Sequence, residues 1–451
     1  MSRKRPIKYL NKKEKALSHA MSQRLAGFLS ELLGWLDEQL DKRLVRTFIG
    51  LIQVILIFRD RPNGLLLSEL GGYLLKPDQA PAGTKRISNL LRSCRWGYGL
   101  IERFLWSGAQ RRVAELHAAD KTAYALWDES VIEKAESIAL EGLGPVRSRK
   151  AARLNRLKPG YYQPPKGSTF VPGMDWIAVL VIGLSGPPVV AAMKWWTRRG
   201  RLASEWPCQL EALLKACLSQ LGDQLIHVFD RGFATLESMA VISRYPIRFI
   251  VRWSNQLELT DLSGRTMLAW QLVRGKPTWE FRDLRDSRRN CLRKMGVLAL
   301  PVTYTGYAGP LWLVVCRRGK GQTPWYLLTT EPILTAPQAW SIVLAYARRW
   351  QIEMTFRFAK SALAFESPRL WRWDHRLKLL LIATLAYAFL LSLLDPALAD
   401  LRQTLLRHWC HRTGQRLKQV KSPLYRLRAA LSRLWLAFSP PILATHTQIS
   451  G

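Results

Sequence analysis

Acidic residues are scarce in this sequence. Its 451 residues include 33 Asp and Glu against 68 Lys and Arg, which leaves a formal net charge of +35. Such an excess opposes compaction by self-repulsion and favours a polyanionic partner, with nucleic acid as first candidate and an anionic membrane surface as competitor. Three stretches hold cations and no acid: residues 3–13, residues 147–158 and everything after Asp400. They are interpreted either as contact surfaces or as solvated faces.

Paired cysteines and complete metal-binding spacings are also missing. The cysteines are scattered, which argues against a disulfide framework and fits a reducing cytosol. His408, Cys410 and His411 lie close together, but no second half-site accompanies them, so we do not expect a zinc site. The chain shows no internal repeat and no low-complexity tract. The six cysteines are Cys94, Cys208, Cys217, Cys291, Cys316 and Cys410.

Membrane-targeting features are nearly absent. The charged start of the chain is not followed by an apolar segment, so no secretory signal is expected. One long apolar run, Leu377–Leu394, approaches the length of a membrane span, with Arg376 and Lys378 at its start and Asp395 at its end. We predict a wholly buried core helix there. We therefore expect a cytoplasmic protein without a membrane partner.

Apolar spacing and turn residues predict an α/β fold with helical regions at both ends. Thr84 is expected to cap a basic helix that either lies against DNA or is an ordinary surface helix. The predicted regions are a helical DNA-binding region (1–120), the first part of a mixed α/β core (121–254), a β-rich insertion (255–335), the helical second part of the core (336–395) and a basic helical region for DNA contact or dimerisation (396–451).

Two aspartates follow predicted strands of the core. Asp128 comes after one apolar run and Asp230 after another, and carboxylates at strand ends face the crevice where α/β sheets bind ligands. Ser185-Gly186-Pro187 separates two β-rich runs and predicts a hairpin. The predicted strands are Ala123–Trp127, Trp176–Leu184, Pro188–Trp196, Gln224–Phe229 and Arg248–Trp253, and the predicted helices are Trp206–Leu221 and Phe233–Tyr245.

A third acid lies in the run YARRWQIEMTFRFAK. If this run is one helix, then Tyr346, Arg349, Glu353 and Lys360 fall within about 60° of one another on a single stripe. That face could hold a metal through the acid and phosphates through the other three side chains. The competing interpretation is an ordinary amphipathic helix whose polar face carries charged side chains.

Three converging carboxylates would bind two divalent ions about 3.5–4 Å apart and support in-line phosphoryl transfer. Taken singly, Asp128 could cap a helix, Asp230 could belong to a turn, and Glu353 could pair with an arginine. Glu129 could be mistaken for the ligand beside Asp128. Strand alternation sends the two neighbours to opposite faces, so only one can face the site.

The spacing Tyr346-x2-Arg349-x3-Glu353-x6-Lys360 resembles the Y-R-E-K signature of DDE transposases of the insertion-sequence-four family, which includes the transposon-five transposase. Asp230-Arg231-Gly232-Phe233 is similar to the second-aspartate block of that family, and Trp127-Asp128 stands where the first block belongs. The likeness runs in order from Tyr124 to Lys360 and includes a β insertion before the glutamate. The residues after Asp128 match no motif of the first block.

The resemblance implies a ribonuclease-H-like core with a metal-binding catalytic triad of Asp128, Asp230 and Glu353, served by two Mg²⁺ ions for which Mn²⁺ can substitute. In that family, activated water nicks the transposon end, the freed 3′-hydroxyl forms a hairpin on the opposite strand, and the reopened 3′ end is joined to target DNA. The implied partners are double-stranded DNA, as transposon ends and target, and a second copy of the chain in a paired-end complex at a prokaryotic nucleoid.

The resemblance also assigns DNA-binding roles. Tyr346, Arg349 and Lys360 correspond to residues that hold phosphates around the hairpin. Trp325, 21 residues before Tyr346, corresponds to a tryptophan that receives an unstacked base, although core packing is the alternative for any of 19 tryptophans. Arg231 is expected either to contact DNA or to pair with a carboxylate.

Two other functions remain open at this point. One is a DNA-binding derivative of such an enzyme that no longer catalyses. The other is a structure-selective nuclease that uses the same sheet without strand transfer. Inverted terminal sequences flanking the coding region would favour the cut-and-paste transposase.

Overall fold

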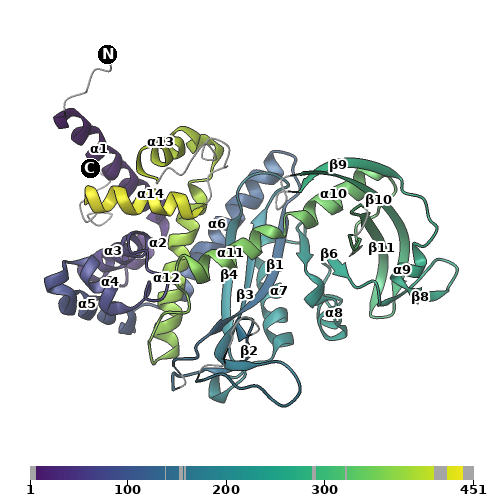
Figure 1. Ribbon diagram of the computed structural model, residues 1–451, viewed down its shortest axis with the longest axis horizontal. Helices are drawn as coiled ribbons and strands as arrows, with labels where there is room; N and C mark the ends of the chain where they lie inside the picture. Colours follow the sequence, from purple (N-terminus) through teal and green to yellow (C-terminus); the bar gives the residue numbers. More distant parts are fainter. Residues whose placement is uncertain are drawn as a thin grey trace.

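A computed structural model describes residues 7–137, 139–151, 156, 159–286, 291–319, 322–410 and 424–439. Figure 1 shows a helical lobe on one side and a long, curved sheet on the other, with helices α11 and α12 between them. Residues 1–6, much of the basic stretch 147–158, and His411, Arg412, Arg416, Lys418 and Lys421 of the tail lie outside the described residues.

The helical lobe combines the two ends of the chain. Helix α14 packs against α3 and α12, and the Arg428 guanidinium donates to the carbonyls of Ile55 and Phe58. The predicted N-terminal helices are therefore present, and the tail joins their core. The helices of this lobe are α1 (Ile7–Phe28), α2 (Ser30–Asp37), α3 (Lys42–Ile57), α4 (Leu67–Leu74), η1 (Pro77–Gln79), α5 (Ala80–Arg92), α6 (Gly99–Ala118), α12 (Trp373–Ser392), η5 (Pro396–Leu398), α13 (Ala399–Trp409) and α14 (Leu424–Ala437).

Helix α12 is the predicted core helix. Among the described helices it alone is long and apolar enough to cross a membrane, yet 83% of its most apolar window is buried inside the protein. It contacts α3, α5, α6 and β4, so it joins the helical lobe to the sheet. A helix that is apolar all round belongs in a protein core when other elements surround it.

Twelve described strands form one mixed sheet in the order β2-β3-β1-β5-β6-β12-β11-β10-β7-β8, with β4 paired to β3 and β9 paired to β10. Strand β1 runs antiparallel to β3 and parallel to β5, and β5 runs parallel to β6. The predicted hairpin is the antiparallel pair β3–β4. The strands and helices of this first half are β1 (Tyr124–Glu133), β2 (Gly144–Arg147), β3 (Phe170–Ile182), β4 (Val189–Trp196), η3 (Gly200–Leu202), α7 (Trp206–Leu221), β5 (Ile226–Phe229), η4 (Arg231–Phe233), α8 (Leu236–Ile242) and β6 (Arg248–Trp253).

The β-rich segment continues the same sheet. Strand β12 returns to pair antiparallel with β6, so the hydrogen-bond ladder is unbroken between the two halves. The chain then enters α10 (Ala336–Ala347) and α11 (Trp350–Ser361). The elements of the insertion are β7 (Glu258–Thr260), β8 (Thr266–Leu268), α9 (Ala269–Leu272), β9 (Glu280–Asp286), β10 (Cys291–Tyr304), β11 (Tyr307–Arg317) and β12 (Trp325–Thr329).

Alternation along β1 divides its side chains between two cores. Leu126 and Ile132 belong to the core shared with the helical lobe, whereas Ala125 and Trp127 belong to the core on the opposite face. Residues of even number on β1 therefore face α11, as the period of two requires.

Two local predictions were wrong. Thr84 does not cap its helix, because α5 begins four residues earlier at Ala80, and the Thr84 hydroxyl donates to the carbonyls of Leu67 and Ala80. The helix predicted from Phe233 is the shorter α8, because Asp230 and the η4 turn occupy the preceding residues and Thr235 caps α8 by accepting from the backbone N–H of Ser238.

The contact between α4 and α5 leads to a stability prediction. A methyl group at Gly83 would overlap the carbonyl of Gly71. We expect Gly83→Ala to lower the free energy of unfolding by about 1–3 kcal/mol, because the two backbones must separate. Gly34 of α2 has no atom within 4 Å of such a methyl, so Gly34→Ala should raise stability by about 0.5–1 kcal/mol. Denaturant unfolding of both variants checks the pair, and equal effects would contradict the close packing.

Candidate active site

Asp128 and Asp230 lie at the same level of neighbouring parallel strands. Tyr124 is paired with Ile226 and Leu126 with Val228, and the same register continued by two residues sets Asp128 opposite Asp230. Adjacent strands lie about 4.8 Å apart. The two carboxylates therefore start from backbone positions that are close enough for a shared site.

The strand that carries Asp128 is longer than predicted. β1 does not end at Trp127 but continues through Glu133, because each of its residues pairs with β3 as far as Gly173. Only the ladder to β5 stops at Leu126. Asp128 therefore lies beyond the end of β5, although it lies in the middle of its own strand, and it faces the same opening as Asp230.

The run from Tyr346 to Lys360 is not one helix, as predicted, but two. α10 ends at Ala347 and α11 begins at Trp350. Between them, the N–H of Arg349 donates to the carbonyl of Tyr346 and that of Ile352 to Arg349, which are three-residue steps. Long-range contacts hold this joint: the Arg348 side chain donates to the Gly186 carbonyl at 2.5 Å, and Arg349 reaches the acids.

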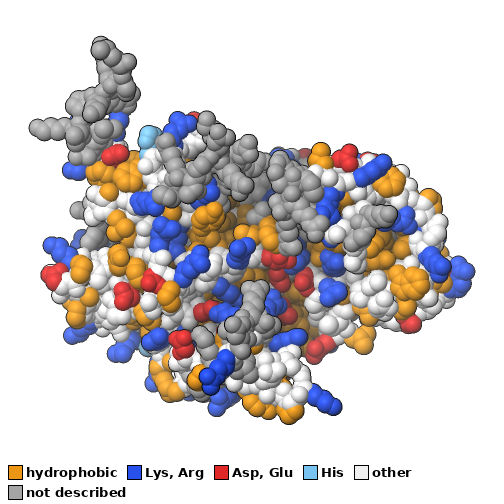
Figure 2. Space-filling model, viewed as in Figure 1, with side chains coloured by type: hydrophobic (Ala, Val, Ile, Leu, Met, Phe, Trp, Pro, Cys, Tyr) orange, Lys and Arg blue, Asp and Glu red, His pale blue; other side chains and the backbone are white. Residues whose placement is uncertain are grey.

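The three predicted acids converge on the guanidinium of Arg349. Its Nη1 lies 3.1 Å from Asp128 Oδ2 and 3.7 Å from Asp230 Oδ2, while Nη2 contacts the Glu353 carboxylate. The Arg349 and Asp128 side chains are each 13% exposed. Figure 2 shows acidic side chains gathered near the centre of this face, where α11 crosses β1, with Lys and Arg around them.

Electrostatics in this cluster are strongly coupled. Burial raises the pKa of Asp128 to about 7; Arg349 opposes the shift, and the charge of Asp230 adds to it. Burial by itself would lower the pKa of Arg349, but Tyr346 and the three carboxylates outweigh burial and raise it. The cluster therefore holds a permanent cation together with one carboxyl group that exchanges its proton near neutral pH.

The donor set fits a hard divalent cation. Carboxylate oxygens are the ligands that Mg²⁺ and Mn²⁺ prefer, and three of them surround one position here. Within the described residues, no three acidic, His or Cys side chains are yet close enough to share one ion. The guanidinium lies between the acids, so ion binding requires Arg349 to withdraw from them.

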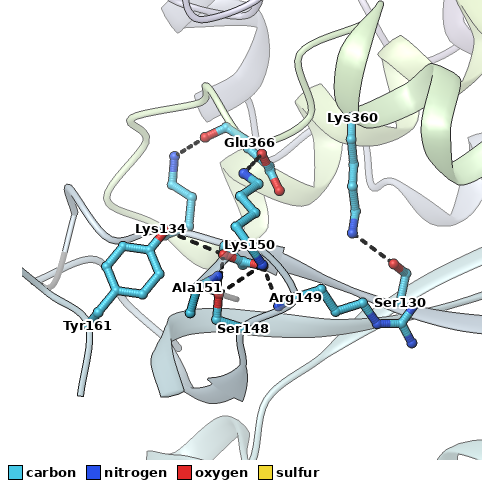
Figure 3. Close-up of polar contacts among 10 residues, drawn as sticks. Ser130, Lys134, Ser148, Arg149, Lys150, Ala151, Tyr161, Lys360 and Glu366 are labelled. Carbon is cyan, nitrogen blue, oxygen red and sulfur yellow. Dashed lines mark hydrogen bonds and ion pairs between the residues drawn. The ribbon is translucent and has the colours of Figure 1, made fainter. Parts of the chain in front are cut away.

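Lys360 of α11 contacts β1 at Ser130, two residues after Asp128. Its Nζ donates to Ser130 Oγ at 2.8 Å, and burial lowers its pKa to about 8. Beside it lies a cavity of about 200 Å³. Figure 3 shows Lys150 paired with Glu366 and Lys134 directed at the Glu366 backbone in this cavity. Sequence reasoning missed these contacts because no motif connects residues 130–150 with residues 360–366.

Trp325 and Tyr346 stack edge to face beside the acids. Their ring centroids lie 5.2 Å apart at 72°, and the Arg349 guanidinium lies 5.8 Å from the Tyr346 ring centre. Arg318 lies 4.7 Å and Arg252 5.9 Å from the Trp325 ring centre. Trp325 is partly exposed, whereas Tyr346 is buried. The two arginines were not predicted, and their basic residue type was the only sequence signal.

Two further residues complete the description. Arg231 begins the η4 turn directly after Asp230 and is exposed. On the opposite face of β1, the buried Trp127 indole donates to His227 Nδ1 at 3.0 Å, and burial lowers the pKa of His227 to about 4. This neutral pair joins β1 to β5 beneath the acids.

Comparison with known proteins supports a DDE transposase domain in part of the chain, without the finer family that the sequence resembles. Residues 209–389 match the family model described as "Transposase DDE domain", a segment that includes Asp230 and Glu353 but begins after Asp128. A solved structure described as the cryo-EM structure of a piggyBac transposase synaptic complex with hairpin DNA is similar at 13% identity over 91% of this chain and 76% of that chain, with a TM-score of 0.40. No curated protein matches the sequence.

The acid cluster predicts pH-dependent metal binding. Because the pKa of Asp128 is raised to about 7, a proton competes for its carboxylate below that pH. We expect the affinity of the DNA-free protein for Mn²⁺, measured by calorimetry, to fall between about pH 8 and about pH 6. Asp128→Asn should remove this dependence, and Arg349→Ala should strengthen binding at both pH values. A pH-independent affinity in the unaltered protein would contradict the role of Asp128.

Proposed function

We propose that this chain is a DNA transposase that cleaves the ends of its element and joins them to target DNA by metal-dependent phosphoryl transfer. The convergence of Asp128, Asp230 and Glu353 on one position is the observation that carries the proposal. Asp128 lies on β1, Asp230 follows β5 and Glu353 lies on α11. The first and the last of these acids are more than 220 residues apart in the sequence. The match of residues 209–389 to a transposase DDE domain gives this site its reaction class.

The order of strands around the acids supports a ribonuclease-H-like core. Strands β4, β3 and β1 are antiparallel neighbours, and β5 and β6 follow parallel to β1. Helix α11 covers the face of β1 that carries Asp128. A sheet of this kind exposes the ends of β1 and β5 at one crevice, and α11 supplies the third acid from above.

The chain's own residues hold and orient the DNA in this proposal. Bound Mg²⁺ ions would activate a water or a 3′-hydroxyl and stabilise the departing oxygen. Arg349 is placed to exchange its carboxylate partners for a phosphate, which a guanidinium grips through two parallel hydrogen bonds. Lys360 of α11 supplies a second, point-like charge beside Ser130, which is two residues after Asp128 on β1. Withdrawal of Arg349 onto the phosphate frees the acids for the ions.

A hairpin intermediate forms part of the proposal. Closing one strand on the other at a duplex end forces a base out of the stack, and an aromatic side chain can receive it. Trp325 is partly exposed, lies against Tyr346 and has Arg318 and Arg252 beside its ring. We assign it the stacking role and expect Arg231 to contact DNA next to Asp230. The active species is proposed as two chains on two DNA ends, acting at a prokaryotic nucleoid.

Amide replacements of the acids test the catalytic assignment. Asp230→Asn and Glu353→Gln should reduce Mg²⁺-dependent nicking of a duplex carrying the element's end by about a thousandfold or more, because several kcal/mol of transition-state stabilisation are lost. End binding should persist, since most phosphate contacts remain. Glu258→Gln is the matched control, because Glu258 is exposed on β7, far from β1 in the order of the sheet.

The same assay separates the competing functions. Wild-type protein that binds ends and never nicks them with Mg²⁺ would favour a binding-only derivative. Cleavage of branched DNA without joining to a plasmid would favour a nuclease. Full activity of Asp230→Asn would refute the triad.

Replacement of Trp325 tests the stacking role. Trp325→Leu keeps an apolar side chain against Tyr346 but removes the stacking surface. Nicking should continue, while hairpin formation should fall about tenfold, since one base–aromatic stack contributes roughly 1–3 kcal/mol. Denaturing gels resolve the two products. Trp279→Ala is the control, because Trp279 is an exposed tryptophan of the same β-rich segment. Equal loss of both steps would indicate a folding defect instead.

A further inference from the structure

Helix α5 presents one exposed polar stripe that the proposed chemistry does not use. Its buried face consists of Ile87, Leu90 and Leu91, and its exposed face carries cations and an amide. The exposed stripe, at spacings of three and four residues, is Lys85, Arg86, Asn89 and Arg92. No acid occurs between Asp78 and Glu102. Side chains at such spacings stand in line along one side of a helix.

The helix is held rigidly at both ends. Near its start, Gly83 lies against Gly71 of α4, and Thr84 donates to the Leu67 carbonyl at 3.1 Å. At its end, the buried ammonium of Lys378 on α12 donates to the carbonyls of Leu91 and Ser93. The stripe therefore keeps a fixed direction relative to the core.

The cations of this stripe lack acidic partners among the described residues. Exposed arginines elsewhere do find carboxylates, as Arg111 does with Glu31 at 2.8 Å and Arg201 with Glu141 at 2.9 Å. Lys85, Arg86 and Arg92 make no such pair within the part of the chain that the structure describes, and α5 itself contains no acid. Unneutralised charge on a rigid helix is complementary to a polyanion.

A second rigid element stands beside α5. The loop 368–372 exposes 58% of Trp371, and Arg369 and Arg372 flank that residue in sequence. The fully buried Arg376 holds this loop by donating to the Leu370 carbonyl at 3.2 Å. A cavity of about 370 Å³ separates loop and helix, and its lining includes Ser88, Arg92, Arg369, Trp371, Arg372 and His375.

The two elements connect to the acid cluster. Arg369 lines both this cavity and the one beside Lys360, which also receives Arg61, Lys134 and Lys150. Basic side chains therefore follow one another from α5 along the loop to the residues drawn in Figure 3. Along this path Lys150 pairs with Glu366, and Arg369 lies 3.6 Å from Glu136. Lys360, at the far end of this path, contacts the strand that carries Asp128.

We propose that α5 is the sequence-reading helix of this protein: it enters the major groove of duplex DNA with Arg86 and Asn89 at base edges, while loop 368–372 holds the backbone of the same duplex. The major groove admits one α-helix, and arginine and asparagine are the side chains that pair with two atoms of guanine and adenine. Lys85 and Arg92 flank them and contact phosphates. This inference rests on the proposed function, because it names the duplex that leads to the acids.

The test selects DNA first and then removes the stripe. Duplexes bound by the wild-type protein are enriched from a random-sequence library in EDTA, so that cleavage is not required. We expect Asn89→Ala and Arg86→Ala to reduce the preference for the enriched duplex over random duplex by roughly 5- to 150-fold each. Lys85→Ala/Arg92→Ala should instead lower the salt slope of binding by about 0.9 for each lost phosphate contact. Trp371→Ala should weaken binding to both duplexes while keeping the preference.

Lys215→Ala/Arg244→Ala is the control of equal charge, since both side chains are exposed on α7 and just after α8. It should leave the preference unchanged. An unenriched library, an unaltered preference in the Asn89 and Arg86 variants, or binding to phosphatidylserine vesicles in place of duplex would each overturn the inference. Wild-type protein that selects DNA through α5 and never nicks it would refute the proposed catalysis and leave the inference standing.

Discussion

The geometry of the candidate site depends on one guanidinium surrounded by three carboxylates. Like charges brought together away from water repel one another, and a buried carboxylate is expensive unless a cation or a proton compensates it. Arg349 provides that cation for Asp128, Asp230 and Glu353. Its position explains why the chain interrupts a helix at this point. The strand register brings two acids together, and the joint between α10 and α11 brings the third acid and the compensating charge to the same place.

Several features were predictable because they depend on neighbours in sequence. The bounds of α7 and β6 match the predicted segments, and β5 ends directly before Asp230, since apolar periodicity and nearby turn residues define them. The buried nature of α12 also followed from its composition and flanking charges. For the site, the ends of predicted strands drew attention to Asp128 and Asp230, and the resemblance to the Y-R-E-K signature added Glu353; the three acids meet at Arg349.

Other features depend on contacts that no local pattern encodes. β1 continues past Asp128 because β3, whose residues lie 40 to 58 positions later than their partners, pairs with it to the end. The break before Trp350 contains neither proline nor glycine, and the contacts of Arg348 with the β3–β4 turn and of Arg349 with β1 account for it. Thr84 looked like a cap because its residue type suits one, yet α5 starts at Ala80 with a proline in its first turn.

The basic composition serves the interior as well as the surface. Arg376, Lys378 and Arg428 are at most 3% exposed, and each donates to backbone carbonyls of other segments. Burial lowers the pKa of Arg428 to about 9 and of Arg376 to about 10. These side chains satisfy carbonyl groups at the ends of helices and in loops. Part of the net positive charge therefore stabilises the interior through hydrogen bonds between segments.

The unbroken hydrogen-bond ladder from β5 through β6 to β12 fixes distances across the sheet. Asp230 follows β5, and Trp325 opens β12, two strands away. Two strand spacings amount to about 10 Å across the sheet, the register sets Trp325 two residues further along the strands than Asp230, and hydrogen bonds fix both displacements. The gap between the acid and the indole is therefore a property of the backbone, and lengthening the loops of the β-rich segment leaves it unchanged. The distance between the carboxylate and the indole can therefore be changed only by substitutions that alter side-chain length.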